Sequence, residues 1–412
     1  MKRICLVVDN DIRYDSRVQR VRQSLSKAYE VITVGFSDDN VEALDEDVIV
    51  ASSSTYKTAS KALRRIFSHI RNQKIIDLPH QDDETAKDIS SFASQPASVR
   101  DYLLDETRNM RFQMKKHSIH RVVSKIDADV YHANDLPVLS ICKEEAMKKG
   151  AKLVYDSHEL YLEQGVFRTR RMNGIYFRLE QEGIERADAV ITVNEFIAKE
   201  LQERYKLVSK PYVVYNCPRK TANKYARHTN GSPIRLLYQG KYSSGRGLKE
   251  LVESLSLLPE GYELHLRGFG EYENHLRNLA LSKGLLGKRV FFHEPVSMHD
   301  ILAQASLADV GILIYEAYCL NNYLASPNKL FEYIGAGLAI FCNKLPFLQK
   351  IVDTYSVGSY VDLITPESLA KGISGFTTLN VQAYKDAAVA ASNVLTWENE
   401  ERKLLSIYDR IL

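Results

Sequence analysis

A loop in the second half of the chain places two cations around small residues. Residues 240–247 read Gly-Lys-Tyr-Ser-Ser-Gly-Arg-Gly, so that Lys241 and Arg246 flank a flexible turn that leads into a predicted helix. Two positive charges, free backbone N–H groups and a helix start can together bind a diphosphate. A solvent-exposed turn explains this loop alone equally well, because glycine-rich loops are common without a ligand.

A second corner crowds a proline, an amide, a lysine and a carboxylate between a strand and a helix. It begins at Pro327, includes Lys329 and Glu332, and is followed by Gly335 and Gly337. Such a corner can offer N–H groups and the positive end of a helix to a phosphate, and Glu332 lies where it could accept a hydrogen bond from a ribose hydroxyl. The alternative is an ordinary helix start, with Pro327 near the first position and the glycines at the end.

A third corner, Gly268-Phe-Gly270, follows the next predicted strand. Its backbone could approach a ligand closely, although a simple tight turn is the more common explanation of such a pair.

In the first half, two consecutive predicted strands end in polar corners. His132-Ala-Asn134-Asp135 follows one strand and Asp156-Ser-His158-Glu follows the next. Ligands bind outside the carboxyl ends of strands in open parallel sheets. A single histidine is usually structural, but two corners with a histidine and a carboxylate favour function. We therefore take His132, Asp135 and His158 as candidates for catalysis.

Asp9-Asn10-Asp11 also ends a strand. An Asp-x-Asp motif could hold a metal with a nucleotide diphosphate, but Asp15 or Ser16 then starts a helix, and a polar rim explains these residues better. We predict no metal site.

These corners must be positioned by parallel strands, and the sequence has the pattern that is typical of such strands. Short apolar runs alternate with helix-like segments, which predicts an α/β fold whose strands are covered on both faces. The predicted strands are 4–8, 31–34, 130–132, 152–155, 189–193, 212–215, 234–239, 263–267, 290–292, 310–314 and 339–342.

The 412 residues exceed one typical domain, and a polar segment, 219–233, separates two sets of strands. We predict two doubly wound, Rossmann-like domains that face a central cleft. The first spans residues 1–216 and the second residues 217–395, with a C-terminal helix near 396–412 that returns to the first.

Charge and composition limit the function. A formal net charge of +3 argues against nucleic-acid binding, and five cysteines without paired spacing favour reduced thiols in a cytoplasmic protein. A basic amphipathic segment, residues 61–71, carries Lys61, Arg64, Arg65 and Arg71 and could lie on an anionic membrane surface. A helix packed on its own domain explains that segment equally well. A mobile loop is predicted near residues 81–95.

Together, the corners resemble the retaining family 4 glycosyltransferases of the GT-B fold. The resemblance covers nearly the whole chain and rests most on Pro327-Asn-Lys-Leu-Phe-Glu332 together with the loop 240–247. Its other elements are Asp15-Ser-Arg-Val18, Ala187-Asp-Ala-Val-Ile-Thr-Val193, Asn216 and Trp397-Glu398.

The resemblance implies site residues by position. Lys241 and Arg246 match the basic pair that holds the donor diphosphate, in reversed order, and Glu332 matches the glutamate that contacts the ribose. The implied donor-binding residues are Gly240, Lys241, Arg246, Gly268, Gly270, Pro327, Asn328, Lys329, Leu330 and Glu332. Leu324 stands where the family has a sugar-binding glutamate, and Asn134 replaces a second histidine.

The implied enzyme is a metal-independent hexosyltransferase. It would move sugar from a UDP- or GDP-linked donor, a co-substrate rather than a cofactor, to a glycan or lipid-linked acceptor with retained anomeric configuration. Bacterial surface polysaccharide synthesis in the cytoplasm, or at the inner face of the membrane, is the expected setting. The alternatives are a nucleotide-sugar 2-epimerase of similar fold and a non-catalytic sugar-nucleotide-binding partner of a glycosyltransferase.

Overall fold

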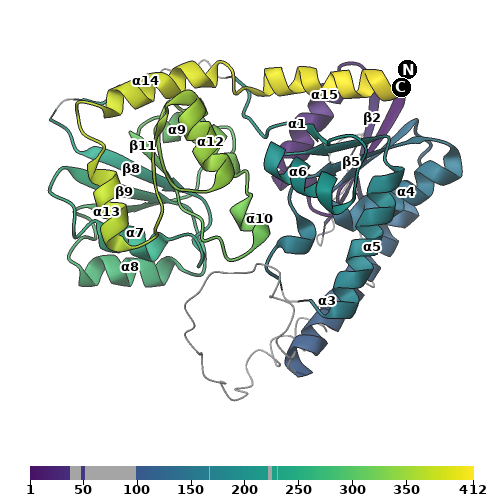
Figure 1. Ribbon diagram of the computed structural model, residues 1–412, viewed down its shortest axis with the longest axis horizontal. Coiled ribbons are helices and arrows are strands. Elements are labelled where there is room, and N and C mark those ends of the chain that lie inside the picture. Colours follow the sequence, from purple (N-terminus) through teal and green to yellow (C-terminus); the bar gives the residue numbers. More distant parts are fainter. Residues whose placement is uncertain (38–47, 52–98, 167, 221–224, 230) are drawn as a thin grey trace. The chain divides into compact units, whose positions relative to one another are not determined.

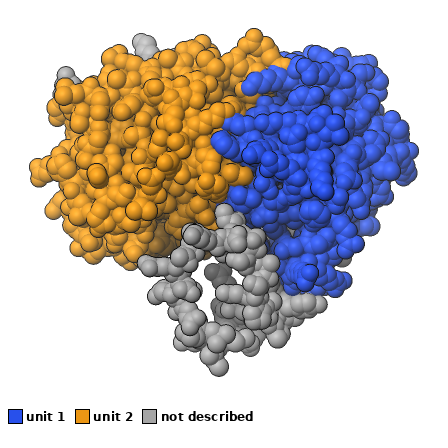
Figure 2. Space-filling model, in the orientation of Figure 1, with its two compact units in different colours: residues 1–214, 319–321, 403–412 blue, residues 215–318, 322–402 orange. Residues whose placement is uncertain are grey.

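A computed structural model describes residues 1–37, 48–51, 99–166, 168–220, 225–229 and 231–412. By its internal contacts the chain divides into two units, coloured separately in Figure 2. The first contains Met1–Val214, Cys319–Asn321 and Lys403–Leu412, and the second contains Tyr215–Tyr318 and Asn322–Arg402.

The first unit is built on a seven-stranded parallel sheet in the order β3-β2-β1-β4-β5-β6-β7. Its strands are β1 (Arg3–Val7), β2 (Glu30–Phe36), β3 (Val48–Ala51), β4 (Val130–Asn134), β5 (Lys152–Ser157), β6 (Ala189–Thr192) and β7 (Tyr212–Val213). The six predicted strands of this half are present, with shifted ends, and β3 is an additional strand. Continuous apolar runs such as 4–8 are buried, as expected for strands covered on both faces.

Helices alternate with these strands (Figure 1). They are η1 (Ile12–Tyr14), α1 (Ser16–Leu25), α3 (Val99–Val123), α4 (Leu136–Lys149), η3 (Tyr161–Glu163), α5 (Arg170–Arg186) and α6 (Glu195–Arg204). Helix α1 starts where the sequence predicts, because the Asp15 side chain accepts hydrogen bonds from the N–H groups of Arg17 and Val18. That cap fixes Arg17 in the first turn.

The second unit has a six-stranded parallel sheet in the order β10-β9-β8-β11-β12-β13. Its strands are β8 (Ile234–Gln239), β9 (Tyr262–Arg267), β10 (Val290–His293), β11 (Val310–Leu313), β12 (Ala339–Asn343) and β13 (Gly358–Val361). Its helices are α7 (Leu248–Ser254), α8 (Glu273–Ser282), α9 (Ile301–Ala305), α11 (Asn328–Gly335), α12 (Pro346–Tyr355), α13 (Pro366–Ser374) and α14 (Val381–Ser392).

In the two remaining helices, the boundary between the two units falls within the helix. Helix α10 (Leu320–Tyr323) and helix α15 (Trp397–Ile411) each have residues in both units. The last ten residues of the chain, Lys403–Leu412, are assigned to the first unit. The main boundary in sequence lies between Val214 and Tyr215, two residues before the predicted end of the first domain.

The polar segment 219–233 is hydrogen-bonded to the second unit. Its described residues form no helix or strand, but His228 donates its backbone N–H to Gln382 at 3.0 Å and Tyr225 bonds Ser392 at 3.1 Å. This segment is therefore held on α14 within the second unit.

Two sequence predictions concern residues outside the described ones. These are the basic segment 61–71 and the loop near 81–95. Among the helices that the structure describes, none is both long and apolar enough to cross a membrane.

Candidate functional site

In the second unit, the loop 240–247 connects the carboxyl end of β8 to α7. Gly240, Gly245 and Gly247 have φ values of 131°, 78° and 57°, which side-chain-bearing residues rarely adopt. Gly247 is the N-cap of α7, and a Cβ there would come within 2.4 Å of the Ile314 side chain. The glycines thus allow the loop to turn tightly at the end of the sheet.

The second predicted corner forms the start of α11. Pro327 is the N-cap in an extended conformation, one position earlier than predicted, and Asn328 is the first helical residue. Leu330 is fully buried and Glu332 is half-buried. Gly337, with a φ of 72°, follows the end of the helix.

Lys329 brings these two corners together. Its Nζ lies 4.1 Å from the centre of the Tyr238 ring. A Cβ added at Gly240 would lie 2.6 Å from Lys329 Cε, so the missing side chain of Gly240 makes room for the lysine. Burial, and then the charge of Arg246, lower the pKa of Lys329 to about 7.

Arg246 supplies the second cation of this corner, with its guanidinium carbon 4.2 Å from the centre of the Tyr315 ring. Three buried polar atoms here lack a hydrogen-bond partner among the described residues: Arg246 Nη1, Ser326 Oγ and Gln239 Nε2. Buried polar groups are normally paired, so unpaired donors beside two cations indicate a place for an anion.

Lys241 differs from Arg246 in exposure, because its side chain faces solvent. Leu324, at the position of the expected family glutamate, is 8% exposed. Arg246 and Lys329 lie close enough for the charge of Arg246 to lower the pKa of Lys329.

The Gly268-Phe-Gly270 turn lies against the protein's own backbone. A Cβ at Gly268 would approach the carbonyl oxygen of Gly240 to 1.9 Å, and one at Gly270 would approach that of Tyr242 to 2.2 Å. These glycines therefore support the loop 240–247, while Phe269 between them is 62% exposed.

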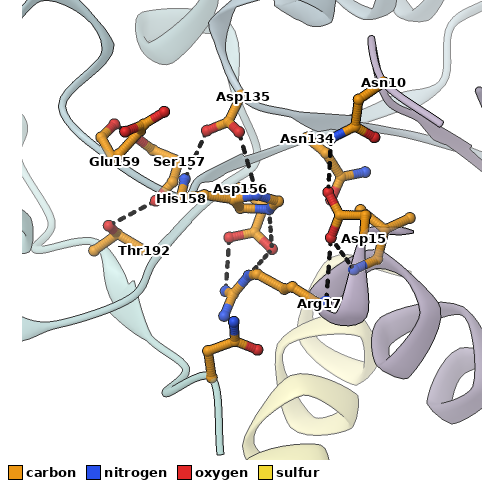
Figure 3. Close-up of polar contacts among 12 residues, drawn as sticks. Asn10, Asp15, Arg17, Asn134, Asp135, Asp156, Ser157, His158, Glu159 and Thr192 are labelled. Atoms are coloured by element: carbon orange, nitrogen blue, oxygen red, sulfur yellow. Dashed lines mark hydrogen bonds and ion pairs between the residues drawn. The ribbon is translucent and has the colours of Figure 1, made fainter. Parts of the chain in front are cut away.

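In the first unit, the two histidine corners lie side by side at the ends of β4 and β5 (Figure 3). His158 Nδ1 lies 3.2 Å from Asp135 Oδ2, and the backbone N–H of His158 donates to Asp135 Oδ1 at 2.8 Å. Asp135 has a φ of 66°, a conformation that costs roughly 1–3 kcal/mol for a non-glycine residue. The three predicted candidates His132, Asp135 and His158 thus meet in one cluster.

Asp156 is the centre of that cluster, although the sequence singled out its neighbour His158 instead. Its carboxylate accepts two hydrogen bonds from Arg17, at 2.8 and 3.0 Å, and both side chains are buried. Asp156 is itself desolvated, but Arg17 and His158 hold its pKa well below the usual range. Nothing in the local sequence pairs Arg17 with a residue so far along the chain.

The pKa values of the two histidines are shifted in opposite directions. Burial lowers the pKa of His132. Burial also opposes protonation of His158, but Asp135 and Asp156 together raise its pKa to about 10. Glu159, in contrast, has a raised pKa because it is buried near Asp135, and it accepts a hydrogen bond from Asn321 at 2.9 Å.

The Asp-x-Asp motif is engaged by basic residues. Asp9 pairs with Lys115 at 3.0 Å, and Asp11 accepts from Arg13 Nε at 2.9 Å. Within the described residues, the one cluster close enough to hold a metal is His120, Glu144 and Glu145, where Lys149 already lies 3.4 Å from Glu145.

Comparisons with known proteins agree with this architecture. Residues 18–217 match the model of Glycosyltransferase Family 4. No curated protein matches the sequence.

Solved structures are similar over the full length. Sucrose-phosphate synthase from Thermosynechococcus elongatus has a TM-score of 0.67 at 14% identity, covering 100% of this chain and 99% of that one. HepE of Anabaena in complex with UDP-glucose has a TM-score of 0.65 at 14% identity, with 100% of both chains covered. The lipopolysaccharide outer core galactosyltransferase WaaB has a TM-score of 0.58 at 11% identity, with 100% of both chains covered.

Proposed function

We propose that this chain transfers a hexose from a nucleotide-diphospho-sugar to a glycan or lipid-linked acceptor. The premise is that residues 18–217 match the Glycosyltransferase Family 4 model and that the two-domain fold is similar to solved glycosyltransferase structures over its full length. We further propose that the reaction retains the anomeric configuration and needs no metal.

The observation that carries this proposal is the cationic corner of the second unit. Arg246 lies in the loop that follows β8 and Lys329 lies in the first turn of α11, and Arg246 Nη1 and Ser326 Oγ are buried donors with no partner among the described residues. A diphosphate would satisfy these donors, and its negative charge would stabilise the protonated form of Lys329. Lys241 would add a third, exposed cation.

The same corner would assist bond cleavage. Negative charge grows on the diphosphate as the anomeric C–O bond breaks, and cations fixed in advance stabilise that charge. Glu332, inside α11, would accept a hydrogen bond from the nucleotide ribose, and backbone from Ser326 to Lys329 would contact the sugar in place of the glutamate that Leu324 replaces.

The histidine corner of the first unit would serve the sugar and acceptor side. His132, Asp135 and His158 place hydrogen-bonding groups at the ends of β4 and β5. We take His158 as the histidine of this cluster that contacts substrate, since its side chain is 16% exposed whereas that of His132 is fully buried.

The donor and acceptor follow from chemistry and from similar proteins. HepE was solved with UDP and UDP-glucose, so a UDP-sugar is the first donor to test, with GDP-sugars next. WaaB acts on lipopolysaccharide, which suggests surface polysaccharide synthesis as the setting. Contact with a membrane through residues 61–71 belongs to the same proposal.

Acceptor-dependent release of nucleotide tests the proposal. The purified chain is incubated with UDP-, GDP- and ADP-sugars, with and without lipid-linked and soluble glycan acceptors. We expect nucleoside diphosphate to accumulate with one donor only when a suitable acceptor is present. Turnover of donor without acceptor would indicate a 2-epimerase. Binding without any turnover would indicate a non-catalytic partner, the alternative that is suggested by Leu324 and Asn134 in place of a family glutamate and histidine.

A further inference from the structure

A single carboxylate oxygen in the first unit faces both histidines of the cluster. Asp156 Oδ2 lies 3.7 Å from His132 Nε2 and 3.6 Å from His158 Nε2. Arg17 completes the surroundings through its two hydrogen bonds to the same carboxylate. Because the Arg17 and Asp156 side chains are 3% and 0% exposed, solvent does not screen this ion pair.

The ring of His158 has a carboxylate beside each nitrogen (Figure 3). Nδ1 lies 3.2 Å from Asp135 and Nε2 lies 3.6 Å from Asp156. A neutral imidazole has one N–H, so one nitrogen would turn a lone pair toward a carboxylate. Only the imidazolium presents an N–H to both acids.

His132 has a different environment. Its Nδ1 lies 2.5 Å from the Tyr408 hydroxyl, and its Nε2 lies 3.7 Å from Asp156 Oδ2. A neutral ring fits both contacts, because Nδ1 accepts from Tyr408 while Nε2–H points to Asp156. The Asp156 carboxylate therefore lies beside a ring that is neutral, His132, and a ring that is cationic, His158.

Resting on the proposed function, we propose that Asp156, with Arg17 as its counter-ion, is a positioning residue that keeps His158 cationic. In this form His158 presents a positive charge to the substrate, and it does not act as a general base toward the acceptor hydroxyl, because neither ring nitrogen has a free lone pair. Among the residues that the structure describes, the charged and titratable groups around this ring are Asp135, Asp156, His132, Arg17 and Glu159.

Arg17 has one further contact that shapes the test. Its Nη1 donates to the Val214 carbonyl at 2.8 Å, at the last residue of the first unit before the chain enters the second. Removing Arg17 alone would disturb that chain segment as well as the ion pair. The decisive variant therefore changes both partners, and the readout is the charge of His158 itself.

The test is a ¹⁵N NMR titration of the imidazole groups of the full chain without nucleotide, with His158 assigned from a His158→Gln variant. We expect both ring nitrogens of His158 to be protonated in the wild type at pH 8. The Arg17→Gln/Asp156→Asn double variant removes both buried charges and leaves neither unpaired. Its His158 should titrate at least one pH unit below the wild-type value.

A matched control is Tyr408→Phe, which alters the environment of His132 and should leave His158 cationic at pH 8. The proposal is overturned if His158 is neutral in the wild type at pH 8, or if the double variant titrates as the wild type does. The wild-type measurement decides even if the double variant does not fold.

Kinetics separate positioning from mere stability. In a folded Asp156→Asn variant, kcat should fall at least tenfold while the KM for donor changes less than threefold, and Asp156→Glu should recover part of kcat. Because the NMR readout uses no sugar nucleotide, a cationic His158 in a chain that transfers no sugar would refute the proposed function and leave the charge assignment standing.

Discussion

The ammonium nitrogen of Lys329 lies 4.1 Å from the centre of the Tyr238 ring, in the space that a side chain at residue 240 would occupy. An aromatic face attracts a cation but does not replace the water that burial removes. Lys329 is therefore a cation held in a site that an anion would complete, which makes the donor corner sensitive to pH.

Donor affinity should decrease as pH rises above about 7, the pKa of free Lys329. A bound diphosphate favours the protonated lysine, so binding takes up a proton where the free lysine is neutral. The affinity is fully expressed below pH 7 and declines up to tenfold per pH unit until the pKa of the complex is reached. Calorimetry of UDP or GDP binding in two buffers of different ionisation enthalpy measures the proton uptake. A Lys329→Met variant should show weaker binding with no such uptake.

Arg246 should contribute more to donor binding than Lys241. Hydrogen bonds to charged groups are worth roughly 1.5–3 kcal/mol, so Arg246→Ala should weaken nucleoside diphosphate binding about 10- to 150-fold. Lys241 is exposed, and its replacement by Ala should cost less than about tenfold. A larger loss of affinity for Lys241→Ala than for Arg246→Ala would show that Lys241, and not Arg246, makes the main phosphate contact.

Gly240→Ala should remove donor binding by displacing Lys329. The added Cβ would lie 2.8 Å from Lys329 Nζ, in a backbone conformation with φ of 131°. Gly284→Ala is the matched control, because Gly284 also has a positive φ, 67°, but no atom within 4 Å of the added carbon. Both should lose stability from backbone strain, and only Gly240→Ala should lose affinity. Equal affinities in the two variants would contradict the assignment of this space to the lysine.

The Arg17–Asp156 pair should matter far more for stability than ion pairs at the surface. Arg17→Ala removes the guanidinium that donates two hydrogen bonds to the buried Asp156 carboxylate, and we expect the free energy of unfolding to fall by about 3–5 kcal/mol. Lys2→Ala, which breaks the exposed pair with Asp129, should cost about 1 kcal/mol or less. Urea denaturation of the two variants measures both. A cost for Arg17→Ala as small as that for Lys2→Ala would argue against a desolvated pair.

Much of the fold could be predicted from the sequence, since long apolar runs identify buried parallel strands. Strand β8 has the predicted bounds, and every predicted strand exists. Two strands were missed for different reasons. Strand β13 has the sequence Gly-Ser-Tyr-Val, which lacks an apolar run, and it is only half-buried at the sheet edge. Strand β3 is a short apolar run, Val-Ile-Val-Ala, but polar residues flank it on both sides.

The residues of the donor corner could also be predicted, because glycines and cations at strand ends carry a local signal. Their geometry could not, since the approach of Lys329 to Gly240 depends on the order of strands in the folded sheet. Similarly, Arg17 and Asp156 are 139 residues apart, and His132 and Tyr408 are 276 apart. Partnerships over such separations leave no pattern in one sequence.

Nucleotide binding tests the central claim most directly. UDP and GDP are titrated by calorimetry into the full-length wild-type chain and into an Arg246→Ala/Lys329→Ala variant, with circular dichroism to establish that the variant is folded. We predict that one of the two nucleotides binds the wild type at a single site and that the double variant binds it at least 100-fold more weakly. A wild type that binds neither nucleotide, or a folded double variant that binds as tightly as the wild type, would contradict the claim.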